Sequence, residues 1–393
     1  MSGSKVVILG GTGIIGSELS RAAAMLGHEV TVVSRGHNRA LREMSVDIPG
    51  LEVILADALD QDSLVGGVGG RRFDVVVDLL SFDAQQLSSK LAVLGKVCDQ
   101  YIFVSSSTIF DGGTSDAPIT EESPMTSSGW SYPEKKIGAE RYLRSESLKT
   151  GLPFTIVRPY ITYSSQRVPF GFWESDIALR LLMKNLPIPV GRELSETPTA
   201  LMHSKDMAYA VSLLIANPDA MGEDFNVAAE ESVTWGEVYA MAASITGSQS
   251  PLVLVDDREV VRVFSGLEGK AADRLLPRVF DTHKLREVIP GYQTQVSLRA
   301  GLERVIPQHL AAMTCDLEPG HLGRIDRLVA DAGMGRALRA EKREQLKKLS
   351  AKASAGYHLR YEMSRSPILS SMKNSMKATA RRILPGNSPY GVS

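Results

Sequence analysis

Residues 6–16 read VVILGGTGIIG, an apolar run followed directly by a glycine-rich loop. The apolar run predicts a buried strand, and residues 17–26 after the loop have the pattern of a helix. The loop satisfies G-x-G-x-x-G from Gly11 and G-x-x-G-x-x-G from Gly10. Such glycines allow a tight turn and let the backbone approach a pyrophosphate at the helix N-terminus. The stretch therefore predicts a dinucleotide-binding unit; the alternative is a tight turn that binds no ligand.

Further apolar runs follow this unit and alternate with helical patterns. Near-continuous Val, Ile and Leu strands separated by helices indicate a parallel sheet that is covered on both faces. We therefore predict the α/β class, with a Rossmann-type doubly wound parallel sheet. The expected strands are residues 6–9, 28–33, 51–55, 74–77, 101–104 and 154–157, with 225–228 returning to the sheet.

The regular alternation weakens after Pro159, which suggests a division of the chain. Residues 160–200 look rich in loops, while residues 230–306 mix helices with one strand at 252–255. We expect a smaller, discontinuous substrate-binding region and a helical C-terminal extension. The predicted boundaries are 1–165 with 200–230 for the dinucleotide-binding domain, 166–199 and 231–306 for the substrate-binding region, and 310–393 for the extension.

Composition narrows the classes of protein. The 393 residues have a formal net charge of −1, which does not suggest a highly basic nucleic-acid binder, and no nucleic-acid partner is expected. Two cysteines form neither a disulfide framework nor a dense cluster of metal ligands, so no metal site is expected. The first residues lack the features of a signal peptide, and no window has the length of a membrane span. A cytoplasmic protein is the expectation.

The end of the second strand bears on the choice of cofactor. An NAD-preferring site usually has a carboxylate there, to hold the ribose diol. This chain instead has Ser34 and Arg35, and a guanidinium can pair with a 2′-phosphate. NADP is therefore favoured over NAD, with a solvated surface arginine as the alternative. Asp57, at the end of the third strand, could accept a hydrogen bond from the adenine amino group.

A second motif adds acid–base chemistry. Tyr132 and Lys136 lie four residues apart on a predicted helix, hence on one face. A neighbouring ammonium and an oxidised nicotinamide would favour the phenolate and make the tyrosine competent to exchange a proton. The strand at 101–104 ends in the hydroxyl-bearing run Ser105–Thr108, beside the expected cofactor site.

With these motifs in this order, residues 5–306 resemble the extended short-chain dehydrogenase/reductase family, of the NAD-dependent epimerase/dehydratase kind. The resemblance implies that Tyr132 is the acid/base, that Lys136 bridges the nicotinamide ribose, and that Ser106 orients the substrate oxygen. Ser105 and Ser107 are the alternatives for the last role. The cofactor contacts are expected at Gly10, Gly13, Ile14, Ile15, Gly16, Ser34, Arg35, Asp57, Leu79, Lys136 and Pro159.

Departures from the family narrow the reaction. Sugar-nucleotide 4,6-dehydratases carry an Asp-Glu pair directly after the catalytic hydroxyl, whereas this chain has Ser107 and Thr108. A dehydratase of that type is therefore disfavoured. Ile161 and Thr199 replace an Asn and an Arg that serve the nucleotide end of the substrate in relatives.

Two groups of residues could complete the substrate site. Arg167 or Arg192 could substitute for the missing arginine, since both lie in the expected substrate-binding region. Phe170, Phe172 and Trp173 could shape the pocket or simply form the core of a loop.

Charge is segregated along the chain. Residues 311–393 carry 15 Lys and Arg against 7 Asp and Glu, a net of +8, so the preceding residues have a net of −9. Apolar residues between 368 and 384 recur near helical spacing among basic ones. This amphipathic segment could dock on its own domain or on another subunit, or contact an anionic membrane surface.

Together these observations predict an NAD(P)-dependent oxidoreductase or epimerase that acts at a secondary alcohol or ketone of a sugar, nucleotide-sugar or related small molecule. One alternative is an NADPH-dependent reductase of a non-sugar carbonyl. Another is a catalytically idle NAD(P)-binding scaffold that uses its basic tail for interaction. A homodimer is expected.

Overall fold

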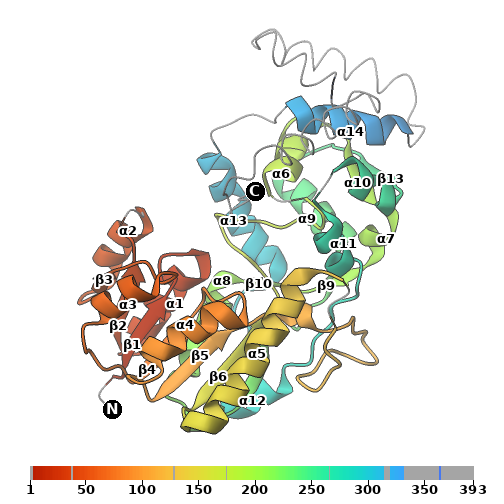
Figure 1. Ribbon diagram of the computed structural model, residues 1–393. Coiled ribbons are helices and arrows are strands. Elements are labelled where there is room, and N and C mark those ends of the chain that lie inside the picture. Colours follow the sequence, from red (N-terminus) through yellow and green to blue (C-terminus); the bar gives the residue numbers. More distant parts are fainter. Residues whose placement is uncertain are drawn as a thin grey trace, which may run out of the picture.

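A computed structural model describes residues 3–36, 39–126, 129–173, 175–264, 266–313 and 319–331, together with Met363. Its centre is a seven-stranded sheet in the order β11-β6-β5-β4-β1-β2-β3, in which every pair of neighbours is parallel. The predicted doubly wound α/β fold is confirmed (Figure 1). The strands are β1 (Lys5–Leu9), β2 (Glu29–Ser34), β3 (Glu52–Leu55), β4 (Val75–Asp78), β5 (Gln100–Val104), β6 (Phe154–Pro159) and β11 (Asp224–Val227).

Helices cover both faces of this sheet because successive strand residues point to opposite sides. Val6 and Ile8 of β1 pack in one apolar cluster, and Val7 and Leu9 pack in a second one. The first cluster contains residues of α1 (Ile14–Met25), α2 (Arg39–Asp47) and α8 (Ser204–Leu213). The second contains residues of α3 (Gln61–Val68), α4 (Ala84–Leu94) and α5 (Ser131–Thr150). The sheet is thus buried on both sides, as its apolar strands require.

The rest of the described chain forms a smaller, mixed region beside one end of the sheet (Figure 1). Its strands pair as β10 (Leu201–His203) with β7 (Ile161–Tyr163), β9 (Pro198–Thr199) with β12 (Val233–Thr234), and β8 (Ile188–Gly191) with β13 (Leu252–Val255). The helices are α6 (Ser175–Met183), α7 (Arg192–Glu196), α9 (Trp235–Thr246), α10 (Asp257–Val263), α11 (Glu268–Arg274) and α13 (Leu298–Ala312). Helix α12 (His283–Val288) instead contacts β11 of the central sheet. Short 3-10 turns lie at Ser107–Ile109 and Pro218–Ala220.

The sequence understated the regularity of residues 160–200. This segment contains α6, α7, β7, β8 and β9 rather than mostly loop. All three of its strands find their partners more than 30 residues away, β7 in β10, β9 in β12 and β8 in β13. Such pairing leaves no local periodicity, so the sequence pattern alone does not indicate it. The expected division into dinucleotide-binding and substrate-binding domains stays a prediction.

The beginning of the C-terminal extension docks on the rest of the chain. Helix α14 (Pro319–Asp331) contacts α10, β8 and β13, and it buries Leu322, Ile325, Leu328 and Val329. These residues therefore pack against their own chain. The amphipathic segment at 368–384 lies outside the described residues. Within the described part of the chain, no helix combines the length and apolar character needed to cross a bilayer.

Candidate functional site

The strand order places a crevice at the carboxyl end of β1. The chain proceeds from β1 to β2 and β3 on one side, and β4, β5 and β6 lie on the other. Open α/β sheets bind ligands at such a point, where the strand order reverses. The glycine loop lies here: Gly10 has φ +80°, and a Cβ on Gly16 would meet the Gly10 carbonyl oxygen at 2.1 Å. These two positions therefore need glycine.

The N-terminus of α1 faces this crevice without a side-chain cap. Gly13 is the N-cap residue and forms no side-chain capping hydrogen bond. The first N–H groups of a helix have no partner within it, and together with the helix dipole they favour an anion. The loop thus fits a pyrophosphate.

Two cavities run along the crevice and share Gly10, Gly13 and Leu80. One has a volume of about 480 Å³ and extends past Ser34, Arg35 and Asp57. The other, of about 380 Å³, extends past Leu79, Pro159 and the Tyr132–Lys136 motif. Between them they are lined by every residue expected to contact the cofactor, including Ile14 and Ile15. A nicotinamide dinucleotide fits this arrangement, because its adenosine and nicotinamide riboside halves are joined by a pyrophosphate, and the two cavities are joined at the glycine loop.

The cavity past Ser34 has the features expected at the adenosine end. Arg35 is exposed at its rim. The Asp57 carboxylate accepts a hydrogen bond from the Leu59 N–H (2.9 Å). The guanidinium of Arg35 thus lies after the end of β2, where an NAD-preferring site usually has a carboxylate.

The serine run after β5 separates into three different environments. Ser106 lines the cavity beside Tyr132, caps the 3-10 turn, and accepts a hydrogen bond from the Thr108 hydroxyl (3.0 Å). Ser107 points away, because it is buried and donates to the Arg158 carbonyl oxygen (2.6 Å). Ser105 also lines the cavity, and its buried Oγ has no hydrogen-bond partner among the described residues. The geometry favours Ser106 as the hydroxyl nearest the tyrosine.

Tyr132 lies in the first turn of α5, between two aromatic rings. Its ring centroid is 6.1 Å from that of Phe82 and 5.1 Å from that of Trp130. Burial raises the pKa of the Tyr132 phenol; a hydrogen bond with Ser106 lowers it, the Asp273 carboxylate raises it, and the Arg167 cation lowers it. The chain alone therefore keeps this phenol protonated at neutral pH.

Lys136 is tethered one helical turn further along α5. Its Nζ donates to the carbonyl oxygens of Ser81 (2.7 Å) and Val104 (2.9 Å), which follow β4 and end β5. Its side chain is only 3% exposed. Burial lowers the pKa of this ammonium to about 8. An ammonium has three N–H donors, so these two carbonyls leave one donor for a further acceptor.

Further residues close the other side of this cavity, and the sequence singled out only Arg167 among them. Tyr160, Thr162 and Arg167 line it. Next to Tyr160, the Asp273 carboxylate accepts hydrogen bonds from Arg274 (2.8 Å) and Arg278 (2.6 Å). No local pattern marks Asp273, Arg274 and Arg278, because they meet Tyr160 only in the folded chain.

Two alternatives that the sequence left open are now decided. Phe170, Phe172 and Trp173 are at most 2% exposed and belong to the apolar core, so the loop-core interpretation holds and the pocket interpretation is wrong. Arg167 lines the cavity that holds Tyr132 and Lys136. Arg192 is the first residue of α7 and does not line that cavity among the residues that the structure describes.

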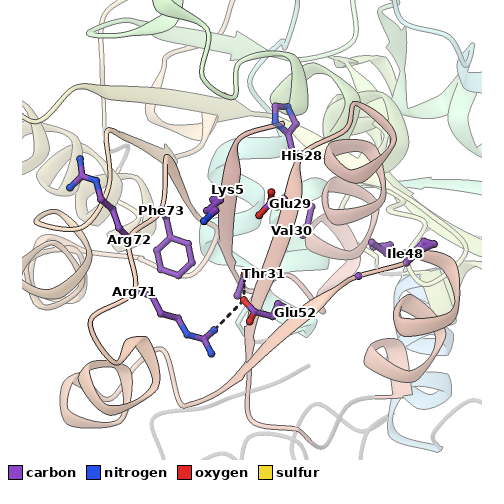
Figure 2. A pocket seen from close by; sticks show the side chains of 12 residues that line it. Lys5, His28, Glu29, Val30, Thr31, Ile48, Glu52, Arg71, Arg72 and Phe73 are labelled. Atoms are coloured by element: carbon purple, nitrogen blue, oxygen red, sulfur yellow. Dashed lines mark hydrogen bonds and ion pairs between the residues drawn. The ribbon is translucent and has the colours of Figure 1, made fainter. Parts of the chain in front are cut away.

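A larger cavity, of about 710 Å³, lies at the opposite edge of the sheet (Figure 2). Its lining includes Lys5, Glu29 and Glu52, which begin β1, β2 and β3. Charges of both signs meet there, and Arg71 forms an ion pair with Glu52 at 3.2 Å (Figure 2). Because ligands of such sheets bind at the carboxyl ends of the strands, we assign the site to the crevice and not to this cavity.

Comparison with known proteins identifies relatives of this chain. A curated relative, chloroplast stem-loop binding protein of 41 kDa b from Arabidopsis thaliana, is 29% identical over 266 residues, which are 64% of this chain. The match spans 66% of that protein, just under two thirds of its length. A second relative, 2'-dehydrokanamycin reductase from Streptomyces kanamyceticus, is 25% identical over 311 residues, 77% of this chain and 82% of that protein.

Solved structures share the fold. The UDP-glucose 4-epimerase of Thermus thermophilus, in complex with NAD, superposes with a TM-score of 0.62 at 18% identity. The superposition covers 78% of this chain and 99% of that structure. The model of the NAD dependent epimerase/dehydratase family matches residues 6–228, more than half of the sequence. The chain therefore belongs to the NAD dependent epimerase/dehydratase family, a group of extended short-chain dehydrogenases/reductases.

Proposed function

We propose that this protein catalyses NADP-dependent hydride transfer at a ketone or secondary alcohol of a sugar, a sugar nucleotide or a related small molecule. The observation that carries the proposal is the meeting of Ser106, Tyr132 and Lys136 in one cavity with the glycine loop. The relative named as a reductase of a dehydrokanamycin supports a keto group on a sugar-like ring.

The residues of this chain would handle the proton. When bound, a nicotinamide dinucleotide supplies or accepts the hydride. Tyr132 gives its phenol proton to the substrate oxygen during reduction and takes it back during oxidation. Ser106 donates a hydrogen bond to the same oxygen and orients it. Lys136 keeps one N–H for a ribose hydroxyl, since Ser81 and Val104 hold the other two.

One feature supports NADP as the cofactor, and another argues against a dehydratase. Arg35 lies at the rim of the adenosine end, where a 2′-phosphate would be. Elimination of water needs a further acid or base, and Ser107 and Thr108 already donate to Arg158 and Ser106. We therefore place a 4,6-dehydratase below a reductase or an epimerase.

The test begins with the nucleotide that the purified full-length chain retains. Denaturation releases it, and mass spectrometry identifies it. Keto sugars and sugar nucleotides are then offered with NADPH or NADH, and the loss of reduced nicotinamide is followed by absorbance. Consumption of NADPH supports the reductase, whereas tightly held NAD⁺ with interconversion of epimers and no net consumption supports the epimerase.

Variants link the activity to the site. Tyr132→Phe is expected to lower kcat by about 100-fold or more, because it removes the exchangeable proton. Lys135→Met, one residue from Lys136 and exposed to solvent, is the matched control. Full activity of Tyr132→Phe would overturn the mechanism. Binding of NADP without turnover of any substrate would favour a catalytically idle scaffold.

The proposal includes a homodimer in the cytoplasm. Light scattering of the full chain tests the dimer, and a mass of one chain would refute it.

A further inference from the structure

A buried polar cluster lies directly beneath Lys136. It consists of Asp78 at the end of β4, Ser81 in the following turn, Lys90 on α4 and Tyr101 on β5, and we call it the Asp78 cluster. These side chains are at most 2% exposed. Lysine and aspartate are almost never fully buried unless they are paired. None of these four side chains takes part in the proposed proton transfer.

Hydrogen bonds fix the backbone of the turn after β4. One Asp78 oxygen accepts from the N–H groups of Leu80 (2.8 Å) and Ser81 (3.0 Å). The other accepts from the hydroxyls of Ser81 (2.5 Å) and Tyr101 (2.9 Å). Lys90 then donates to the Ser81 hydroxyl (2.8 Å), and its Nζ lies 3.9 Å from the Asp78 carboxylate. Ser81 is thus held through both its backbone and its side chain.

The same residue presents its carbonyl to Lys136. The Ser81 oxygen accepts from the Lys136 Nζ at 2.7 Å, so the position of the ammonium depends on this turn. The rings of Phe82 and Phe103 flank the ammonium, with centroids 5.3 and 5.0 Å from Nζ. A continuous chain of contacts therefore runs from Lys90 through Ser81 to Lys136.

Several charged groups face Lys136 from neighbouring elements. After burial, which lowers the Lys136 pKa most, the carboxylates of Asp78 and of Glu140 on α5 raise it, and Lys90 on α4 lowers it. Asp83, the N-cap residue of α4, in turn raises the pKa of Lys90. The phenols of Tyr101 and Tyr132 have raised pKa values and stay neutral. Lys90 and Asp78 therefore act on the Lys136 ammonium in opposite directions.

A buried ion pair is weak evidence for stability, because the desolvation of two charges offsets their attraction. We propose that Asp78, Ser81 and Lys90 are positioning residues for Lys136: they hold its ammonium at the floor of the crevice and set the charge around it. This inference rests on the role proposed for Lys136 in the function above. It predicts a change at Lys136 when the cluster is altered, without any loss of cofactor binding at the distant adenosine end.

The experiment measures the Lys136 titration in three backgrounds. The pH dependence of the free energy of unfolding is compared between each protein and its Lys136→Met partner, which isolates the contribution of Lys136. In Lys90→Met the titration is expected to shift to higher pH, and in Asp78→Asn to lower pH. Lys96→Met removes an exposed lysine just after α4 and is the control, expected to match the parent protein. Shifts in the same direction, or none, would overturn the proposal.

Activity provides the second readout. The alkaline arm of the pH profile of kcat is expected to shift as the unfolding data do, to higher pH in Lys90→Met and to lower pH in Asp78→Asn. Ser81→Ala is expected to lower kcat by about 10- to 100-fold with little change in the Kd of the dinucleotide, because a misplaced group loses rate. Unchanged kcat in Ser81→Ala would contradict the positioning role.

Two safeguards keep the test decisive. If Lys90→Met does not fold because Asp78 is left unpaired, the double variant Asp78→Asn, Lys90→Met removes both charges. Its Lys136 titration is expected at higher pH than that of the single variant Asp78→Asn, because the repelling ammonium is gone; an equal or lower value refutes the proposal. If Tyr132→Phe retains full activity the proposed function fails, yet the unfolding data still report whether the Asp78 cluster controls Lys136.

Discussion

The pKa of Lys136 makes the stability of this protein depend on pH in a predictable direction. In the unfolded chain the ammonium loses its proton near pH 10.5, whereas in the folded chain it does so near pH 8, because burial disfavours the charge. Between these values the unfolded state binds more protons than the native state. The free energy of unfolding contributed by this residue therefore rises with pH over that range.

The magnitude follows from the two titrations. Integrating from about pH 7 to about pH 9.5 gives a gain of about 2 kcal/mol in the free energy of unfolding from Lys136. The residue is 3% exposed, so solvent screening does not diminish this value greatly. Below about pH 7 both states are protonated, and the contribution of Lys136 no longer changes with pH.

The assay is urea unfolding of the wild type and of Lys136→Met, followed by fluorescence at both pH values. The difference in free energy of unfolding between the two proteins cancels the other titrating groups. The loss of two hydrogen bonds adds the same amount to this difference at both pH values. The free energy of unfolding of the wild type, relative to that of Lys136→Met, is expected to be about 2 kcal/mol higher at the higher pH than at the lower pH. Lys135→Met, which removes a side chain that is 56% exposed on the same helix, is expected to follow the wild type. A difference that is constant with pH, or that moves against the wild type, would refute the reasoning.

Four further variants test other parts of the site. Arg35→Glu is expected to weaken NADP binding by about 10- to 100-fold and NAD binding far less, as titration calorimetry would detect, because a charge-assisted hydrogen bond is lost; equal losses would remove Arg35 from the argument. Ser106→Ala should lower kcat by about 100-fold. Ser107→Ala should lower the free energy of unfolding by about 1 kcal/mol with little loss of kcat, because the Ser107 hydroxyl donates to the Arg158 carbonyl. A larger loss of kcat in Ser107→Ala than in Ser106→Ala would assign the substrate-orienting role to Ser107. Arg278→Met is expected to lower the free energy of unfolding in urea by about 3–5 kcal/mol, because it leaves the buried Asp273 carboxylate without one of its two guanidinium partners. A loss within about 0.5 kcal/mol, as for a surface substitution, would contradict this expectation.

The parts of the site that the sequence predicted are those set by local chemistry. The glycine loop needs residues without a Cβ at Gly10 and Gly16, and Tyr132 and Lys136 share a face because a helix repeats every 3.6 residues. Each requirement acts within a few neighbours and is therefore visible as spacing. The alternating strands and helices of the sheet were visible for the same reason.

The remaining parts depend on contacts between distant segments. β8 pairs with β13 and β9 with β12, and neither pairing leaves a local pattern. Lys90 gave no signal either, because a lysine on a helix is usually a solvated residue; its burial depends on Asp78, which comes from another element. Residues of this kind become identifiable only when burial and partners are known.

The same long-range contacts connect Asp273 and its arginine partners to the segment that follows Ser106. Arg278 follows α11 by four residues, yet its guanidinium donates to the carbonyl oxygen of Phe110 (2.9 Å) in the segment that follows Ser106. Next to it, the Gly113 N–H donates to the Pro277 carbonyl and the Ile119 N–H to the Val279 carbonyl. Residues 107–119 are therefore held from the side on which Asp273 and Arg274 lie. A displacement of that side would be transmitted to the 3-10 turn that Ser106 caps, because backbone hydrogen bonds join the two segments. The position of the Ser106 hydroxyl thus depends on residues about 170 positions later in the chain, which a local motif cannot reveal.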